Sequence, residues 1–186
     1  MTVEELIQDA QRRMDRSIEA ARNEFNTVRT GRASAALLDR IAIDYYGQPT
    51  PLKQLATINV PEPRMLTIQP FDPNSLKDIE RAIQESELGL TPSNDGKVIR
   101  LPIPQLTEER RKELVKVVRH LAEEGRIAVR NVRRDVMHHL KELVNKGDVG
   151  ADEEHRGEER LQKLTDEHTA KIDDLLKRKE AEITEV

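Results

Sequence analysis

The segment LVKVVRHLAEEGRIAVRNVRRDV, residues 114–136, indicates the fold class, because it reads as one long amphipathic helix. At about 3.6 residues per turn, its apolar residues share one face. They are Leu114, Val118, Leu121, Gly125, Val129, Val132 and Val136. On a different side of the helix, basic side chains occupy one narrow arc. They are Arg119, Arg126, Arg130 and Arg133, and Lys112 and Lys116 extend the arc toward the N-terminus. Glu123 is the only acid in this arc, so we expect one buried face and one row of guanidinium groups.

Two further segments have one apolar stripe each. We expect the long helix to begin after an N-cap at Thr107 and to run to about Asn145. Residues 3–29 repeat apolar side chains at steps of three and four, with a capping box at Thr2 and Glu5 and a stop at Gly31. A third helix is expected from about Asp152 to the C-terminus. Three such stripes are buried only against one another, which predicts a long antiparallel three-helix bundle.

Residues 31–104 have a different pattern. Short strands are expected at 41–46, 57–60, 65–68 and 98–103, with a helix over 75–88. We interpret Gly47, Pro49 and Pro51 as a turn, and the many prolines exclude a long helix here. The predicted fold is therefore α+β, with a small β/α/β domain (31–104) inserted into a bundle of 1–30 and 105–186.

The chain crosses between the two predicted domains twice, near 29–34 and near 102–105. Paired short crossings form a natural hinge, and proline restricts its freedom. We expect a restricted swivel centred on Gly31, Pro102 and Pro104.

Charge is distributed unevenly along the 186 residues. The net charge is −4, which is unusual for a general nucleic-acid binder. Residues 105–147, however, hold eleven Lys/Arg and seven Asp/Glu (+4), whereas residues 148–186 hold seven and thirteen (−6). The chain has no Trp, two Tyr and two Phe, so it has few platforms for stacking bases. If it binds nucleic acid, we expect it to recognise backbone and shape rather than base sequence.

Motifs of catalysis are missing from the sequence. It lacks a phosphate-binding loop, a G-x-S-x-G elbow and an H-E-x-x-H metal motif. There is no cysteine, and the histidines lack ligand spacing, with the adjacent His138 and His139 pointing about 100° apart on a helix. We expect no catalytic residue, no cofactor, no metal site and no small-molecule substrate. With no apolar run of membrane-spanning length and no signal-like N-terminus, we expect a cytoplasmic protein that does not bind membranes. We also expect a monomer.

The arginine row has two interpretations. It could be a solvated face of salt bridges, in which Arg126 pairs with Glu123 and Arg130 pairs with the acidic third helix. Alternatively, it binds a polyanion, because acids are nearly absent from its arc and a second basic cluster, Arg29 and Arg32, lies where the first helix meets the hinge. Together with Arg110 near the start of the long helix, these residues would form a track suited to a phosphate backbone.

At these residues the chain resembles the ribosome recycling factor family. The matching stretches are VRTGRAS (28–34), YYGQPTPL (45–52), LTEERRK (106–112) and RIAVRNVRRD (126–135). The resemblance covers essentially the whole chain. It implies an L-shaped, tRNA-sized molecule whose bundle is the long arm and whose α+β domain is the short arm.

The resemblance also implies a function. The family binds the ribosome after termination through large-subunit ribosomal RNA. With elongation factor G, whose GTP hydrolysis drives the step, it splits the subunits so that mRNA and tRNA leave. By matching position, the resemblance implies that Arg133 is the chief RNA contact. The other implied or candidate RNA-binding residues are Arg130, Arg29, Arg32, Arg126, Arg119 and Arg110.

Two other hypotheses stay open at this point. A helical adaptor or co-chaperone would use the basic face on an acidic protein, and it would not sediment with ribosomes in the absence of that protein. A hydrolase would turn over a nucleotide unaided, which we do not expect.

Overall fold

The computed structural model describes residues 1–184, which divide into two compact units. The first unit comprises Met1–Thr30 and the segment from Glu108 onward, and the second comprises Gly31–Thr107. The second unit thus extends three residues beyond the expected boundary at 104.

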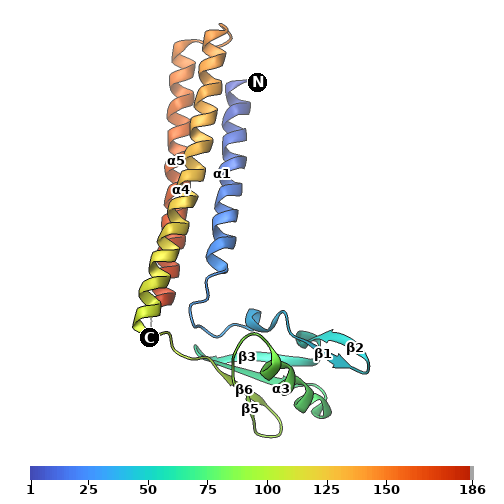
Figure 1. Ribbon diagram of the computed structural model, residues 1–186. Coiled ribbons are helices and arrows are strands. Elements are labelled where there is room, and N and C mark those ends of the chain that lie inside the picture. The colour runs from blue at the N-terminus through green and yellow to red at the C-terminus, as the bar shows by residue number, and fades with distance from the viewer. Residues whose placement is uncertain (185–186) are drawn as a thin grey trace. The chain divides into compact units, whose positions relative to one another are not determined.

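The first unit is a bundle of three helices, α1 (Val3–Asn26), α4 (Glu108–Asn145) and α5 (Ala151–Thr184), each of which packs against the other two (Figure 1). At about 1.5 Å per residue, the 38 residues of α4 span roughly 57 Å. The expected start after Thr107 and end at Asn145 are confirmed, as is the capping box of Thr2 and Glu5. The end of α1 differs from the prediction, because the helix stops at Asn26 and Gly31 lies in the following linker.

Apolar stripes form the core of the bundle, as their spacing predicts. The buried side chains of α1 repeat at Val3, Ile7, Ala10, Met14, Ile18, Ala21 and Phe25, joined by Leu6. On α4, Ala122 is buried and Leu121 only half-buried, a shift of one residue from the expected face. His168 of α5 is buried, with its Nδ1 2.7 Å from the Leu164 carbonyl oxygen and its Nε2 2.7 Å from Asp15 Oδ1 on α1.

Two glycines let the helices of the bundle approach closely. A Cβ added at Gly125 of α4 would lie 3.1 Å from Ile172 Cδ1 on α5 and 3.4 Å from Ala21 Cβ on α1. A Cβ added at Gly157 of α5 would lie 3.2 Å from Val3 on α1 and 3.4 Å from Leu140 on α4. Each glycine therefore touches both other helices, and together the two contacts define how the three helices align.

The second unit contains a hairpin and a four-stranded antiparallel sheet. Strands β1 (Ala42–Tyr45) and β2 (Gln48–Pro51) form the hairpin, and β3 (Ala56–Glu62), β4 (Met65–Pro70), β6 (Ile99–Pro102) and β5 (Ser93–Asn94) form the sheet in the order β3-β4-β6-β5. Helix α3 (Leu76–Glu85), the short helix α2 (Leu52–Leu55), and two 3-10 turns (Ala35–Leu38 and Pro73–Ser75) complete the unit. Its core includes Leu66, Ile68, Ile79, Ile83, Ile99 and Leu101.

The prediction of a turn over Gly47–Pro51 is wrong in part. The turn is Tyr46-Gly47, both with positive φ (51° and 83°), and Gln48–Pro51 pairs with β1 as strand β2. Positive φ at both central residues is the geometry of a tight hairpin turn. Pro49 and Pro51 are tolerated because β2 is an edge strand that, among the described residues, pairs only with β1. No described strand lies on its other side, so the missing N–H groups of the prolines leave no hydrogen bond unmade there.

We predict that Gly125→Val destabilises the bundle by about 1–3 kcal/mol, because the added atoms must displace Ile172 and Ala21. Thermal or urea unfolding followed by circular dichroism measures the change. Ala20→Val places the same side chain on an exposed position of α1 and serves as the control. Equal stabilities for Gly125→Val and wild type would show that the close approach is not required.

A second prediction concerns acid stability. Arg13 of α1 donates to Asp135 of α4 at 2.6 Å, and this bond lowers the pKa of Asp135 below its ordinary value of 3.8. A carboxyl group whose folded pKa is depressed stabilises the fold above its unfolded pKa, and this contribution is lost as the pH falls through the folded pKa. We therefore expect Asp135→Asn to lower the free energy of unfolding at pH 7, by roughly 0.5–1 kcal/mol for a pair this exposed.

The difference between Asp135→Asn and wild type should shrink as the pH falls from about 4 to 2, through the lowered pKa of Asp135, which unfolding curves at pH 7 and pH 2 would measure. Asp174→Asn changes the same charge at an exposed position of α5 and should leave the stability unchanged at both. A difference that persists undiminished at pH 2 would contradict the assignment.

Candidate nucleic-acid interface

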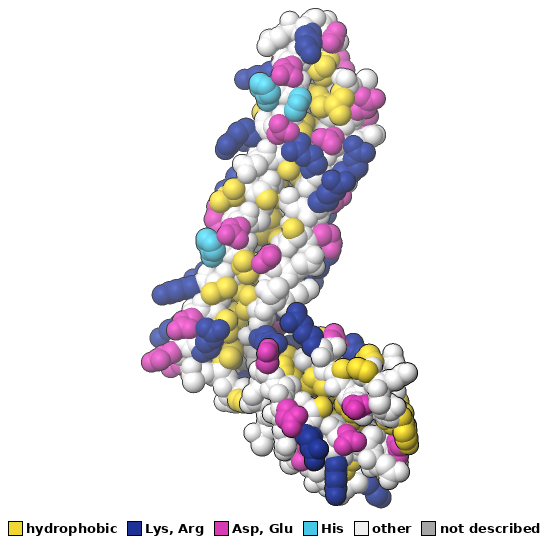
Figure 2. Space-filling view, turned by 45° about the vertical axis from the view of Figure 1, so that its right-hand side comes forward, with side chains coloured by type: hydrophobic (Ala, Val, Ile, Leu, Met, Phe, Trp, Pro, Cys, Tyr) yellow, Lys and Arg dark blue, Asp and Glu magenta, His cyan; other side chains and the backbone are white. Residues whose placement is uncertain are grey.

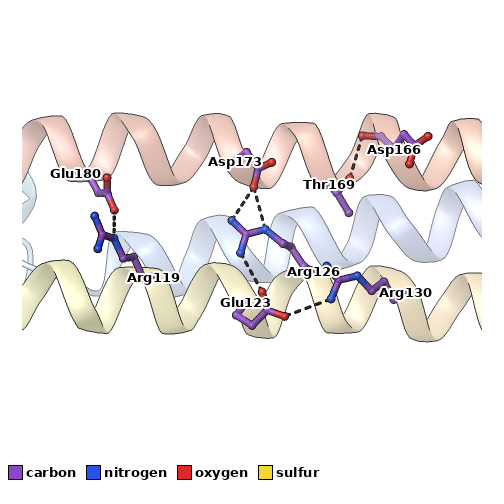
Figure 3. Close-up of polar contacts among 8 residues, drawn as sticks. All are labelled: Arg119, Glu123, Arg126, Arg130, Asp166, Thr169, Asp173 and Glu180. Atoms are coloured by element: carbon purple, nitrogen blue, oxygen red, sulfur yellow. Dashed lines mark hydrogen bonds and ion pairs between the residues drawn. The ribbon is translucent and has the colours of Figure 1, made fainter.

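The arginines of α4 form a ladder with α5. Arg119, Arg126 and Arg133 follow one another at intervals of seven residues, so they lie nearly in line along the helix. Each reaches across to α5, where Glu180, Asp173 and Gln162 run in the opposite direction (Figure 3, which draws the first two pairs). The antiparallel packing of α4 and α5 thus brings basic and polar side chains together along one edge of the bundle.

The first two rungs of the ladder are ion pairs. Arg119 Nε donates to Glu180 Oε1 at 2.7 Å. Arg126 donates to Asp173 Oδ1 from Nε at 2.9 Å and from Nη2 at 2.7 Å, and the Arg126 side chain is only 22% exposed. The bond to Asp173, with a smaller contribution from Glu123, raises the pKa of Arg126 above its ordinary value.

Glu123 is shared by two arginines. Its Oε2 accepts from Arg126 Nη1 at 3.0 Å and its Oε1 accepts from Arg130 Nη1 at 3.2 Å. The hydrogen bond from Arg126, followed by that from Arg130, lowers the pKa of Glu123 below its ordinary value of 4.5. The carboxyl group is therefore ionised at neutral pH and holds both guanidinium groups.

These contacts modify the prediction that few acids neutralise the arginine row. The pairing of Arg126 with Glu123 is confirmed, and Arg126 and Arg119 also find carboxylates on α5. Arg130, which was expected to pair with the third helix in the salt-bridge interpretation, bonds to Glu123 instead. The α4 helix pattern alone could not show these partners, because they lie on another helix.

Positive charge remains uncompensated toward the C-terminal part of the row. Arg133 Nη1 donates at 3.1 Å to Gln162 Oε1, a neutral amide, whose own nitrogen bonds Asp166. Arg134 is exposed and makes no ion pair or hydrogen bond through its side chain within residues 1–184. Arg130 has only a share of Glu123. The segment 130–134 is therefore the most positive part of the row.

Arg134 was not among the sequence-predicted residues. Its position four residues after Arg130, on the same side of a helix, was a signal that could have identified it.

The predicted hinge-side arginines lie at one end of the bundle or at the start of the second unit. Arg29 is exposed and forms no ion pair with another residue of the described chain. Its neighbour Thr30 lies 3.4 Å from Glu182 of α5, two residues from the partner of Arg119, so Arg29 and Arg119 are at the same end of the bundle. Arg110 is exposed and bonds Glu113 at 2.9 Å, and Arg32, also exposed, belongs to the second unit.

The bundle surface has no Phe, Tyr or Trp ring with which to stack bases. Phe25 is the only such residue of the described bundle, and it is 3% exposed in the core. Tyr45, Tyr46 and Phe71 belong to the second unit. Figure 2 shows Lys and Arg side chains projecting along the bundle among Asp and Glu. Such a surface can contact phosphates but offers no large aromatic ring as a platform for bases.

Within residues 1–184, no three His, Asp or Glu side chains are grouped so that they could hold a metal ion. His138 pairs with Glu142, and His139 bonds the Asp135 carbonyl oxygen, so each contacts its own helix. None of the helices in this range is both long enough and apolar enough to cross a membrane.

Comparison with known proteins identifies relatives of the whole chain. A family model for ribosome recycling factors matches residues 21–184. Ribosome-recycling factors from Rubrobacter xylanophilus and Synechocystis are 59% and 56% identical, covering 97% and 93% of this chain and 97% and 95% of theirs.

Two solved structures are also similar to the chain. The first, a solution structure of a ribosome recycling factor, has a TM-score of 0.75 at 44% identity and covers 100% of this chain and 99% of its own. The second is a model of the T. thermophilus ribosome recycling factor, bound with E. coli elongation factor G to the E. coli post-termination complex. Its TM-score is 0.65 at 47% identity, with both chains fully covered. This chain, with its helical bundle and small sheet domain, belongs to the ribosome recycling factor family.

Proposed function

We propose that this chain recycles ribosomes after termination by binding large-subunit ribosomal RNA through the arginine edge of α4. Elongation factor G would supply the energy by hydrolysing GTP, so the chain would need no catalytic chemistry of its own. We expect the chain to act as a monomer. The observation that carries the RNA contact is the charge left over at Arg130, Arg133 and Arg134, on a long helix that has no Phe, Tyr or Trp. The related structure on a post-termination complex supports the same partners.

The chemistry of the edge favours phosphate as its ligand. A guanidinium group offers a planar fork of donors that fits two phosphate oxygens. Arg133 is the best placed, because Gln162 orients it without cancelling its charge. Arg126 is held by two carboxylates, so fewer of its donors are open to RNA than those of Arg133. Among the proposed RNA-binding residues, we therefore rank Arg133, Arg130 and Arg134 above Arg126 and Arg119, with Arg29, Arg32 and Arg110 as contacts toward the hinge.

A hinge between the two units would let the chain act mechanically. In the second unit, Ala33 N–H donates to the Pro63 carbonyl at 2.7 Å and Ile103 N–H donates to the Arg64 carbonyl at 2.8 Å. Both crossings are therefore anchored on the same turn. Pro102 lies within β6, paired with Met65, so we propose that bending occurs outside these anchors, at Gly31–Arg32 and Pro104–Thr107.

Gly31 is suited to this role in the proposed hinge. Its φ is +77°, and an added Cβ would lie 3.1 Å from Leu106 Cγ in the other crossing. A larger residue would meet both a strained backbone and a steric clash there.

We predict that Arg133→Ala weakens binding to the large ribosomal subunit by roughly tenfold, the equivalent of about 1.4 kcal/mol. The slope of log affinity against log salt should fall by nearly one, as for one lost phosphate contact. Co-sedimentation over a range of salt concentrations measures both quantities. Arg22→Ala removes the same charge from α1, where Arg22 pairs only with Glu19, and should change neither.

If Arg133→Ala keeps its circular dichroism spectrum, its affinity and its salt slope, Arg133 does not contact RNA. Sedimentation of the wild type only in the presence of a client protein would instead favour the adaptor hypothesis.

We also predict that locking the hinge separates binding from splitting. Because the chain has no cysteine, one cysteine can be placed in each unit beside the crossings and joined by a cleavable reagent. The locked protein should bind ribosomes normally but split subunits slowly with elongation factor G and GTP. Cleaving the linker should restore splitting, and single-cysteine variants treated alike are the controls. Full splitting by the locked protein would exclude a need for rotation.

A further inference from the structure

We propose that Glu123 limits the affinity of the arginine edge by occupying the position that an RNA phosphate would take between Arg126 and Arg130. This inference rests on the proposed function and adds a residue that tunes it. In this role Glu123 determines how readily the chain dissociates from RNA, beyond its salt bridges within α4.

The geometry of the Glu123 carboxylate is that of a bridging anion. One oxygen accepts from Arg126 at 3.0 Å and the other accepts from Arg130 at 3.2 Å (Figure 3). The two non-bridging oxygens of a phosphodiester can accept from two guanidinium groups in the same manner. The carboxylate therefore stands in for a phosphate between the two guanidinium groups.

Asp173 has a different role from Glu123. It accepts from the Nε and Nη2 edge of Arg126, which fixes the guanidinium group across the α4–α5 interface. With that edge held, the Nη1 group of Arg126 is presented toward Glu123 and Arg130. Removing Asp173 would release the arginine, whereas removing the charge of Glu123 would leave the arginine fixed and free a donor.

Solvent exposure makes Glu123 replaceable by a ligand. Its side chain is 49% exposed and that of Arg130 is 51% exposed, so an incoming phosphate can reach both. Exchange of one anion for another conserves the hydrogen bonds to the arginines but must overcome the repulsion of the displaced carboxylate. The intramolecular pair thus weakens RNA binding without abolishing it, a useful property for a factor that must leave the ribosome after each cycle.

The test compares Glu123→Gln with wild type in binding to purified large ribosomal subunits. We expect roughly three- to tenfold tighter binding at low salt, since one nearby repulsive charge is lost, and a salt slope steeper by up to about one. Dissociation, followed by dilution or competition, should be slower by a similar factor. Glu124→Gln makes the same charge change one residue along the helix, where Glu124 pairs with His120, and should have little effect.

A second pair of variants tests the mechanism. If Glu123 acts by occupying Arg130, then Glu123→Gln should gain much less affinity when it is made in Arg130→Ala. A purely structural Glu123 would instead lower stability slightly on substitution and leave affinity unchanged. Equal affinities for Glu123→Gln and wild type, with the fold intact by circular dichroism, would overturn the inference.

Including Arg133→Ala in the same series separates the two levels of the account. If Arg133→Ala weakens binding and Glu123→Gln does not strengthen it, the proposed RNA edge stands and the role of Glu123 fails. If Arg133→Ala is without effect, the RNA edge itself fails, whatever Glu123→Gln does.

Discussion

The close contact between Gly125 on α4 and Ile172 on α5 determines where the functional side chains lie. An added Cβ at Gly125 would come within 3.1 Å of Ile172 Cδ1, so a glycine here lets the side chain of α5 pack closely on α4. The next residue on each helix is Arg126 and Asp173, which pair with each other, and the Arg126 side chain is only 22% exposed. Packing in the core thereby sets which arginine meets which carboxylate at the edge.

With the two helices in this register, the positive charge that no carboxylate neutralises increases toward the C-terminal end of the arginine row on α4. Toward the N-terminal end of the row, the carboxylates of Glu180 and Asp173 pair with Arg119 and Arg126. Toward the C-terminal end, α5 presents the neutral amide of Gln162 instead of a carboxylate, so no acid on α5 neutralises the charge of Arg133. Because surface ion pairs contribute little to stability, this arrangement matters more for which arginines can bind an anion than for how stable the bundle is.

Much of the fold could be predicted from local patterns. The limits of α4 follow from Thr107, the acids after it and the glycine at 147, all of which act within one or two turns of helix. Strand β2 was missed because Pro49 and Pro51 usually break strands, and only pairing on a single side makes them acceptable. The early end of α1 at Asn26 was missed because the apolar repeat continues to Val28, which is buried beyond the helix.

The candidate site could be predicted only in part. The arginine row is visible from a periodicity of seven and four, but its neutralisation is not, because Asp173 lies 47 residues from Arg126 in sequence. Pairing over such a separation depends on the register of two helices, which the stripe of either helix does not specify. The distinction between the held Arg126 and the available Arg133 therefore required the structure.

The most direct test of the central claim is a structure of this chain bound to a ribosome after termination. We expect RNA phosphate oxygens within about 3 Å of the guanidinium groups of Arg133 and Arg130, with Arg126 still bonded to Asp173. We also expect no base to be stacked on the bundle. A complex in which Arg130, Arg133 and Arg134 face solvent or protein, while another surface contacts the RNA, would contradict it.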